Sequence, residues 1–419
     1  MAVAAKPKGE EMTPEHEEEV IIVGAGQSGL AAAACLSVRG VASCLVLERD
    51  DCVASLWRHR AYDRLRLHLP KRQCALPHAP HAAAAPDYLP RDDFAAYLDA
   101  YASRFGVRTR LRREVRSARH DARRARWLVD AVDLATGRAE RYAARHLVAA
   151  AGENDERVVP EVPGMDTFPG KVVHSADYRS AGAFKGKSVL VVGCSNSGFE
   201  IAYDLAAGGA AAVSIAVRGE VHLVSREVWS VGMALQRYLP TWAVDRLVLL
   251  MCAVVFGGDT ARYGLRRPAV GPFAMKMTTP AYPVFDVGTF AYQVRGDPRR
   301  AGRHQERPRR RRRVRRRPAP RFVFATGYRS ITKQWLKSDD GLIGDDGMAG
   351  RSYPDHWKGE NGMYCAGMVR RGIYGSGEDA ELIADDISKQ MKRRSSEPAH
   401  NGHITLVEKR FLLPVCNPP

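Results

Sequence analysis

The sequence lacks the paired cysteines that a redox disulfide or a structural metal site requires. Its eight cysteines are scattered, no two of them form a Cys-x-x-Cys pair, and no histidine cluster accompanies them at metal-binding spacing. This pattern excludes a dithiol disulfide reductase and a structural zinc site, and it favours a reduced, intracellular protein.

Signals for hydrolases and for membrane insertion are also missing. The 419 residues contain no Gly-x-Ser-x-Gly elbow and no His-Glu-x-x-His pair, which excludes the corresponding hydrolase and metalloprotease sites. The most apolar run, residues 247–256, is too short to cross a bilayer. We therefore expect no transmembrane segment and interpret this run as a buried helix or, alternatively, as a helix on a membrane surface. Residues 1–18 lack a secretory signal and predict a disordered tail.

Acidic residues are almost absent from one segment, and this absence explains most of the net charge. Residues 297–321 hold thirteen arginines against Asp297 and Glu306, a local balance of +11 that leaves only +6 of the total +17 for the rest of the chain. The remainder, 45% hydrophobic and 26% charged over the whole chain, has the composition of an ordinary globular protein. A basic partner-binding surface is therefore not a property of the whole molecule.

The arginine-rich segment, residues 296–321, also lacks apolar residues to bury. Val314 is its only large aliphatic residue, and the composition changes abruptly at both ends. Arg, Pro, Gly and Ala share GC-rich codons, which favours a translated frameshift, a mis-spliced exon edge or a gene-model error. The alternative is a natural basic insertion, such as a nuclear-localisation-like loop. We expect no nucleic-acid partner, because no aromatic residues are interleaved with the arginines and no nucleic-acid-binding fold accompanies them.

What is present is a dinucleotide-binding pattern near the start. From Glu19 the chain reads VIIVGAGQSGLAAAACLSVRGVASCLVLERD, an aliphatic strand, a glycine-rich turn, a helix and a second strand. Gly24 permits the tight turn, Gly26 lets the backbone approach a pyrophosphate, and Gly29 allows close packing of helix on strand. Glu48 can accept hydrogen bonds from an adenosine ribose with a free 2′-hydroxyl. This unit therefore suits FAD.

The pattern recurs in SVLVVGCSNSGFEIAYDLAAGGAAAVSIAVRG. Gly193 and Gly198 match Gly24 and Gly29 in offset, and Arg218 stands near the offset of Glu48. A guanidinium can bind a 2′-phosphate bidentately, so this unit suits NADPH. Ser195 replaces the middle glycine and would crowd the pyrophosphate unless its hydroxyl donates a hydrogen bond; the alternative is a structural βαβ unit with a surface arginine.

The segment FPGKVVHSADYRS lies just before the second unit and has the spacing F-x-G-x-x-x-H-x-x-x-Y. This spacing resembles the identifying sequence of flavin-containing monooxygenases. SLWRHRAYDRLRLHLPKRQCALP, AAGEN and FATGYRS resemble the plant YUCCA-type branch. The similarity covers about residues 20–295 and 322–390.

The resemblance implies a set of site residues. His174 and Tyr178, with Ser197 of the second turn, are expected at the NADPH site, and Trp57, Gly152, Gly327 and Asp379 at the FAD site; His68 and Asn196 are the candidate catalytic residues. His68 stands where related monooxygenases often carry an asparagine near the isoalloxazine. Each of four residues also has a purely structural alternative. His68 would be a hydrogen-bonded loop histidine and His174 a hydrogen-bonded structural histidine, Trp57 would pack in the core, and Asp379 would lie at a loop-to-helix junction without a cofactor contact.

The resemblance also implies an activity. NADPH reduces FAD, the reduced flavin forms a C4a-(hydro)peroxyflavin with O2, and indole-3-pyruvate is decarboxylated to indole-3-acetate, an auxin. The alternatives are a general N- or S-oxygenating flavin monooxygenase and an inactive paralogue with a basic nucleic-acid-binding loop. We expect a cytoplasmic protein, with association with the endoplasmic reticulum surface as a further option.

The expected fold class is α/β, with two Rossmann-like dinucleotide-binding domains and the FAD domain interrupted by the NADPH domain. The expected boundaries are a tail at 1–18, the first part of the FAD domain at 19–164, the NADPH domain at 165–295, the arginine-rich segment at 296–321, the return of the FAD domain at 322–395, and a tail at 396–419.

Overall fold

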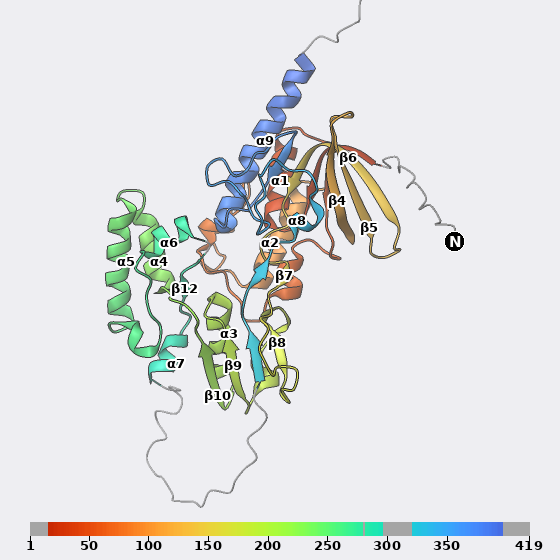
Figure 1. Ribbon diagram of the computed structural model, residues 1–419. Helices are drawn as coiled ribbons and strands as arrows, with labels where there is room; N and C mark the ends of the chain where they lie inside the picture. The colour runs from red at the N-terminus through yellow and green to blue at the C-terminus, as the bar shows by residue number, and fades with distance from the viewer. Residues whose placement is uncertain (1–15, 280, 296–320, 397–419) are drawn as a thin grey trace, which may run out of the picture.

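The computed structural model of the protein describes residues 16–279, 281–295 and 321–396. In this part the chain forms two units built on parallel strands, with a lobe of helices beside the second unit (Figure 1). The expected α/β class with two Rossmann-type units is confirmed. The arginine-rich segment up to residue 320 and the tails at 1–15 and 397–419 lie outside the described residues.

The first unit is a seven-stranded sheet. Its strands, in spatial order, are β3 (Thr109–Arg110), β2 (Cys44–Leu47), β1 (His16–Val23), β6 (Ala139–Ala149), β5 (Arg126–Asp133) and β4 (Arg113–Asp121), with β15 (Met363–Cys365) paired to the end of β6. Strand β1 is almost wholly apolar from Val20 because both of its faces are covered: Val20 and Ile22 join one core cluster, and Ile21 and Val23 the other.

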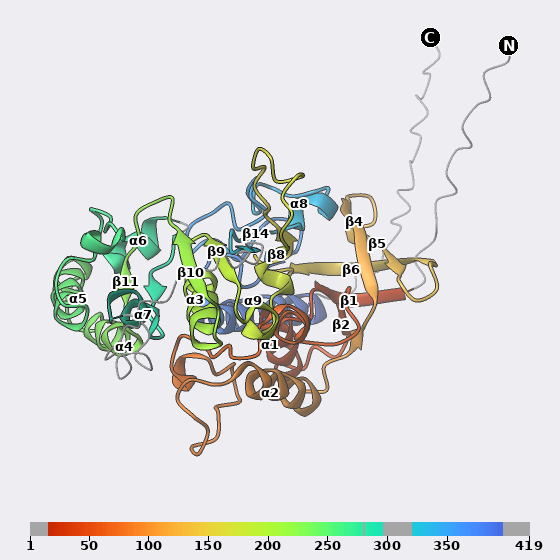
Figure 2. The same cartoon turned by 90° about the horizontal axis from the view of Figure 1, so that it is seen from below.

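Three helices cover one face of this sheet: α1 (Gln27–Val38), α2 (Arg91–Arg104) and α9 (Gly372–Ser396). Helix α1 is rich in alanine, so α9 packs closely along it, and Arg39, which directly follows α1, forms ion pairs with Glu381 and Asp385 of α9. The two helices lie side by side in the views of Figures 1 and 2. Segments far apart in sequence thus complete one core. The other face packs against α8 (Thr332–Trp335) and its flanking loops.

The second unit is a four-stranded parallel sheet. Its order is β10 (Ala212–Ala216), β9 (Ser188–Val192), β13 (Arg321–Phe324) and β8 (Val172–His174), and helix α3 (Asn196–Ala207) packs on it. Strand β13 was expected to begin the return to the FAD domain at residue 322. The structure pairs it instead with β9 and β8, so the return follows Phe324.

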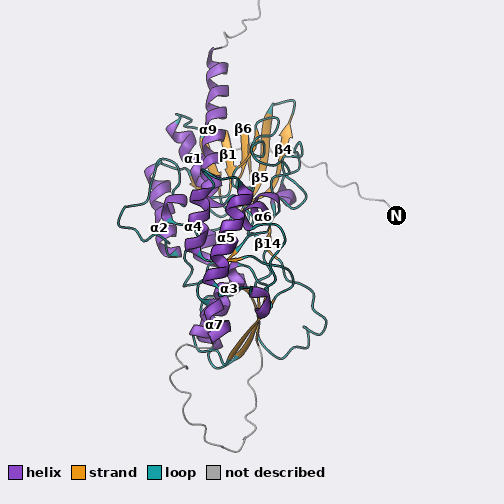
Figure 3. Cartoon of the chain, turned by 90° about the vertical axis from the view of Figure 1, so that its left-hand side faces the viewer, coloured by secondary structure: helices purple, strands orange, loops and turns teal. Residues whose placement is uncertain are grey.

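The helical lobe consists mainly of α4 (Arg226–Leu235), α5 (Thr241–Val255), α6 (Pro272–Thr278) and α7 (Thr289–Arg295), with a small sheet of β11 (Leu223–Val224) and β12 (Val284–Phe285) (Figure 3). Its core includes a stacked pair of rings from Trp229 and Phe273, 3.9 Å between centroids. Helix α5 contributes Val244, Val248 and Cys252 to this core and exposes its other side. Residues 247–256 were expected to form a buried helix or, alternatively, a helix on a membrane surface, and the structure shows a helix with one buried side and one exposed side.

Two chain segments connect the units and pair with each other. They form the antiparallel ribbon of β7 (Glu156–Arg157) and β14 (Tyr328–Arg329). The remaining elements are the π-helix η1 (Leu56–Arg60) and the 3-10 turns η2 (Lys71–Gln73), η3 (Ser175–Asp177), η4 (Ala181–Phe184) and η5 (Thr260–Tyr263). At the amino-terminal side, residues 16–18 belong to strand β1 rather than to the expected tail.

Candidate functional site

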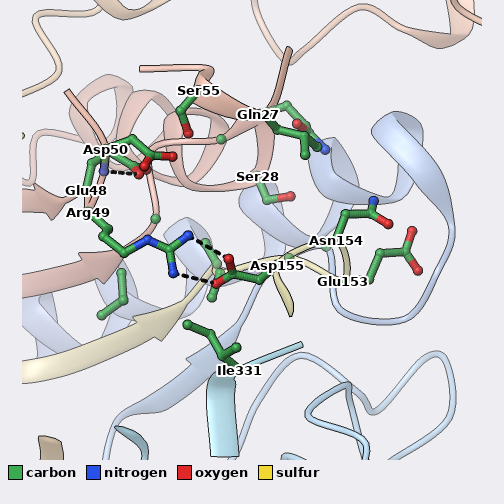
Figure 4. A pocket seen from close by; sticks show the side chains of 18 of the residues that line it. Gln27, Ser28, Glu48, Arg49, Asp50, Ser55, Glu153, Asn154, Asp155 and Ile331 are labelled. Carbon is green, nitrogen blue, oxygen red and sulfur yellow. Dashed lines mark hydrogen bonds and ion pairs between the residues drawn. The ribbon is translucent and has the colours of Figure 1, made fainter. Parts of the chain in front are cut away.

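A pocket opens at the carboxyl ends of the parallel strands of the first unit, where an α/β sheet places its ligands. It is lined by residues within 23–60, 113–115 and 150–155, and by the return segments with Ile331, Gly367 and Ser376. Figure 4 shows Gln27, Ser28, Glu48, Ser55 and Asn154 around it. Of the residues expected at the FAD site, Gly24, Gly26, Glu48, Trp57 and Gly152 line the pocket.

The glycines of the first turn form a cradle that fits a pyrophosphate. A Cβ on Gly24 would lie 2.5 Å from the Ala150 carbonyl oxygen, and one on Gly29 would lie 1.9 Å from the Gly24 oxygen. A Cβ on Gly26, the residue that precedes α1, would meet nothing within 4 Å. Gly24 and Gly29 are therefore needed for the fold, while Gly26 keeps space open at a helix N-terminus where a phosphate binds favourably.

Glu48 lies at the end of β2 with its carboxylate held by the backbone. Ala25 N donates to Oε2 over 2.7 Å and Asp50 N to Oε1 over 2.9 Å. Burial raises the pKa of Glu48 above its usual value, although the two backbone hydrogen bonds act in the opposite direction. The side chain is thus fixed at the pocket wall, where its remaining lone pairs can accept from ribose hydroxyls.

Arg49 and Asp155 form a bidentate pair across the pocket that sequence reasoning missed. Their contacts are 2.6 and 3.1 Å (Figure 4), and Arg60 also contacts Asp155. The partners are 106 residues apart, so spacing gave no signal, although Arg49 directly follows Glu48. Trp57 packs edge-on against Phe94 at 4.9 Å and its Nε1 donates to Gln27, so it both lines the pocket and completes the core.

Asp379 does not face the pocket. Helix α9 begins at Gly372, so Asp379 is not at a loop-to-helix junction but is fully buried two turns inside the helix. Its carboxylate contacts His356 Nε2 at 2.8 Å and accepts from Gly367 N at 2.8 Å. Since Gly367 lines the pocket, Asp379 positions a pocket loop and is not expected to touch the cofactor.

The turn of the second unit repeats the first with the same geometry. A Cβ on Gly193 would lie 2.4 Å from the Ala325 oxygen, and one on Gly198 would lie 2.2 Å from the Gly193 oxygen. The backbone bonds match as well, since Gly24 N donates to Leu47 O and Gly193 N to Ala216 O. Both units therefore have the dinucleotide-binding turn in its folded form.

Gly327 takes part in this repeat and is not a residue of the first pocket. Ala150 N donates to Val23 O, and Ala325 N donates to Val192 O. By this register Gly327, with φ +89°, is the counterpart of Gly152, with φ +79°. The structure therefore places Gly327 in the second unit, contrary to the assignment to FAD.

Ser195 occupies the position of Gly26 as the residue that precedes its helix. Its hydroxyl accepts from Gly198 N at 3.5 Å and is exposed. The side chain of Asn196 has a structural contact: its Oδ1 accepts from Phe285 N at 2.7 Å, which connects α3 to β12. Ser197 is half-buried in the first turn of α3.

Arg218 lies one residue further along than the acidic position of the first unit. Val23 pairs with Leu47, and its counterpart Val192 pairs with Ala216, so Val217 corresponds to Glu48. The Arg218 side chain is exposed and forms no ion pair within the described residues. It is free to contact a 2′-phosphate, as expected for an NADPH site.

His68 contacts the second unit and does not line the pocket. Its Nε2 lies 3.0 Å from Oε1 of Glu200 in α3, and its ring stacks on Phe285. Glu200 is buried, and its carboxylate also accepts from Tyr62 at 2.6 Å and from Arg226 at 3.2 Å. Burial opposes the ionisation of Glu200, but its partners outweigh this effect and lower its pKa.

His174 and Tyr178 have structural contacts at the edge of the second sheet. Nδ1 of His174 accepts from Ala176 N at 3.2 Å, and its ring lies edge-on to Tyr328. Burial lowers the pKa of His174, so the imidazole is neutral at pH 7. The Tyr178 hydroxyl donates to Asp204 at 2.5 Å and the ring is fully buried.

Known proteins share this arrangement. The family model described as "Pyridine nucleotide-disulphide oxidoreductase" matches residues 21–234. The chain is 42% identical to the probable indole-3-pyruvate monooxygenase YUCCA10 of Arabidopsis thaliana, over 88% of this chain and 97% of that protein. It is 44% identical to the indole-3-pyruvate monooxygenase YUCCA1 of Oryza sativa subsp. japonica, over 89% and 92%. The chain belongs to the YUCCA family of indole-3-pyruvate monooxygenases.

Solved structures agree on the fold. A flavin-containing monooxygenase from Stenotrophomonas maltophilia matches with a TM-score of 0.60 and 20% identity over 90% of this chain and 99% of that one. A steroid monooxygenase bound to NADP matches with a TM-score of 0.63 and 18% identity, over 90% and 86%. The chain is thus a flavin-dependent monooxygenase that uses FAD and NADPH. The word "disulphide" in the family description does not apply to a dithiol here, since the described cysteines are all free and the sequence has no Cys-x-x-Cys pair.

Proposed function

We propose that this YUCCA-family monooxygenase converts indole-3-pyruvate, O2 and NADPH with one proton into indole-3-acetate, CO2, water and NADP⁺. The bond between the keto carbon and the carboxylate breaks, one oxygen atom of O2 enters the product acid, and the other leaves as water. The relatives named for this substrate support the choice. The observation that carries the proposal is the duplicated glycine turn, which provides one nucleotide site on each side of the interface formed by His68 and Glu200.

When bound, FAD supplies the electron transfer and oxygen activation, and NADPH supplies the hydride. The protein's residues position these groups. Gly24, Gly26 and the N-terminus of α1 would hold the pyrophosphate of FAD, and Glu48 its ribose. Gly193, Ser195 and Arg218 would hold NADPH.

His68 acts in this proposal as a positioning residue at the interface. Its ring is held between Phe285 of the helical lobe and Glu200 of the second unit. Asn196 has the same kind of role, because its amide oxygen is engaged by Phe285 N. Neither is proposed as the group that transfers a proton to the substrate.

For location, we propose the cytoplasm, with contact to the endoplasmic reticulum surface as the finer option. Within the described residues, no helix is long and apolar enough to cross a membrane.

The experiment that tests the reaction compares the product formed from indole-3-pyruvate with the product formed from a soft amine or a thioether. Indole-3-acetate formation with little oxygenation of the other two supports the proposal, and the reverse result favours a general N- or S-oxygenating enzyme.

A further inference from the structure

The outer side of helix α5 is an apolar surface that the fold does not use. Trp242, Leu250 and Val254 are 64%, 64% and 78% exposed. They stand at intervals of eight and four residues, so they form one row along the helix. Leu247 and Val255 on the same helix, Tyr238 before it and Met277 of α6 add further exposed apolar side chains. We call this group of seven residues the α5 surface.

The opposite side of the helix explains why the α5 surface is not required for stability. Val244, Val248 and Cys252 are buried against α4 and α6. Gly232 of α4 lies so close that a Cβ there would meet Val248 at 2.8 Å. The lobe is thus closed by the inner side of α5, and no described residue covers the outer side. Helix α5 forms the left-hand edge of the molecule in Figure 1 and faces the viewer in Figure 3.

The charged residues of the segment that carries the α5 surface are mostly basic. Residues 231–279 contain five arginines and Lys276 but only two acids, Asp245 and Asp259. Asp245 is buried and accepts from Phe273 N and Ala274 N, which leaves Asp259 as the one exposed acid in this range. Arg246 lies in the row itself, with its guanidinium 5.5 Å from the Trp242 ring.

We propose that the α5 surface docks on a bilayer that contains anionic phospholipids. An exposed apolar row with a tryptophan and flanking arginines is the composition of a helix that lies in the interface plane. Helix α5 has fifteen residues, which makes it about 22 Å long, shorter than the hydrocarbon core of a bilayer. It therefore lies on the membrane and does not span it.

A second copy of this chain fits the α5 surface less well. Two such surfaces facing each other would bring the arginines of both copies together, with Asp259 as the one exposed acid of residues 231–279 in each copy, which is unfavourable at an interface. An anionic lipid surface supplies the opposite charge and accepts the apolar row at the same time. The inference does not depend on the proposed reaction, because docking needs neither substrate nor turnover.

Tryptophan quenching by brominated phospholipid tests the proposal with the full-length, FAD-loaded protein. The vesicles contain phosphatidylcholine with or without phosphatidylserine. Of the six tryptophans, Trp242 is exposed, Trp127, Trp229 and Trp335 are buried, and the half-buried Trp57 and Trp357 pack against the core of the first unit. The part of the quenching that Trp242→Phe removes therefore reports contact at α5. We expect quenching with the anionic vesicles, and we expect Trp242→Phe to bind them with most of that quenching lost. Binding without quenching would assign the contact to another part of the chain, such as the arginine-rich segment, and would overturn the proposal.

A triple variant, Trp242→Ser, Leu250→Ser and Val254→Ser, supplies the second readout. It should bind anionic vesicles at least about tenfold more weakly while its NADPH oxidation without vesicles stays unchanged. The matched control is Leu134→Ser, Val159→Ser and Val162→Ser, which removes exposed apolar side chains elsewhere and should bind like the wild type. Equal binding of the two triple variants would contradict the proposal. So would a lipid-independent dimer that the first triple variant abolishes.

Discussion

The imidazole Nε2 of His68 lies 3.0 Å from Oε1 of Glu200, and this contact joins a loop of the first nucleotide unit to helix α3 of the second. Glu200 also holds Tyr62 from the first unit and Arg226 from the helical lobe. Its side chain is only 3% exposed, so one buried carboxylate connects three parts of the molecule.

Replacing Glu200 should therefore destabilise the fold. Glu200→Ala leaves Arg226, itself 15% exposed, without its carboxylate, and loss of one partner of a buried ion pair costs about 3–5 kcal/mol. The free energy of unfolding in denaturant measures the effect. Glu227→Ala, an exposed acid on α4, is the control and should stay within about 0.5 kcal/mol of the wild type. Equal stability of the two variants would show that Glu200 has no such role.

Gly26 and Gly29, two of the three glycines of the first turn, should respond differently to substitution by alanine. Gly29→Ala places a Cβ 1.9 Å from the Gly24 oxygen, and we expect a loss of about 3 kcal/mol or failure to fold. Gly26→Ala meets no protein atom and should fold normally, but the methyl group occupies the space of the pyrophosphate. We expect FAD to bind at least about tenfold more weakly, because a loss of about 1.4 kcal/mol of binding free energy already lowers the affinity by that factor. Flavin absorbance after gel filtration measures the FAD that the protein retains. Normal flavin content in Gly26→Ala would exclude this turn as the phosphate cradle.

Arg218 should determine the preference for NADPH over NADH. A charge-assisted hydrogen bond contributes about 1.5–3 kcal/mol, so Arg218→Ala should raise KM for NADPH by roughly 10- to 100-fold and leave KM for NADH nearly unchanged. Steady-state oxidation of the two nucleotides measures this. Arg72→Ala, which removes another exposed arginine, should change neither constant; a parallel rise for both nucleotides in Arg218→Ala would contradict a role in 2′-phosphate binding.

Glu48 should make FAD binding depend on pH. Burial raises its pKa above 4.5 in the protein without ligand, and only the ionised carboxylate can accept from both ribose hydroxyls. At a pH near or below this raised pKa, Glu48 must lose its proton when FAD binds. The affinity for FAD should therefore rise as the pH is raised through that pKa and become constant above it. Flavin fluorescence titrations check this, and Glu48→Gln should bind more weakly with no such pH dependence. The same pH profile in both proteins would assign the titration to another group.

The glycine turns could be predicted from sequence because their determinants are local. Strand, turn and helix lie within about one βαβ unit, and the steric need for Gly24, Gly29, Gly193 and Gly198 follows from backbone approach inside that unit. The same holds for Glu48, which directly follows its strand.

The remaining site depends on pairings between distant segments. From the sequence, strand β13 was expected to start the return to the FAD domain. Its pairing with β9 assigns β13, and with it Gly327, to the second unit. Asp379 was expected at a helix N-terminus, yet the helix begins seven residues earlier, at Gly372. Arg49 with Asp155 and His68 with Glu200 are 106 and 132 residues apart, and no local periodicity encodes such contacts. The gene-level interpretation of the arginine-rich segment stays a prediction, tested by sequencing transcripts across it.

The central claim is that this chain couples both nucleotide sites to decarboxylation of indole-3-pyruvate. The most direct measurement incubates the FAD-loaded protein with NADPH, indole-3-pyruvate and ¹⁸O2, and quantifies NADPH consumed and labelled indole-3-acetate formed. The account predicts about one labelled product per NADPH, with one ¹⁸O atom in the new carboxylate. NADPH consumption without labelled indole-3-acetate, or a purified chain that binds no flavin, would contradict it.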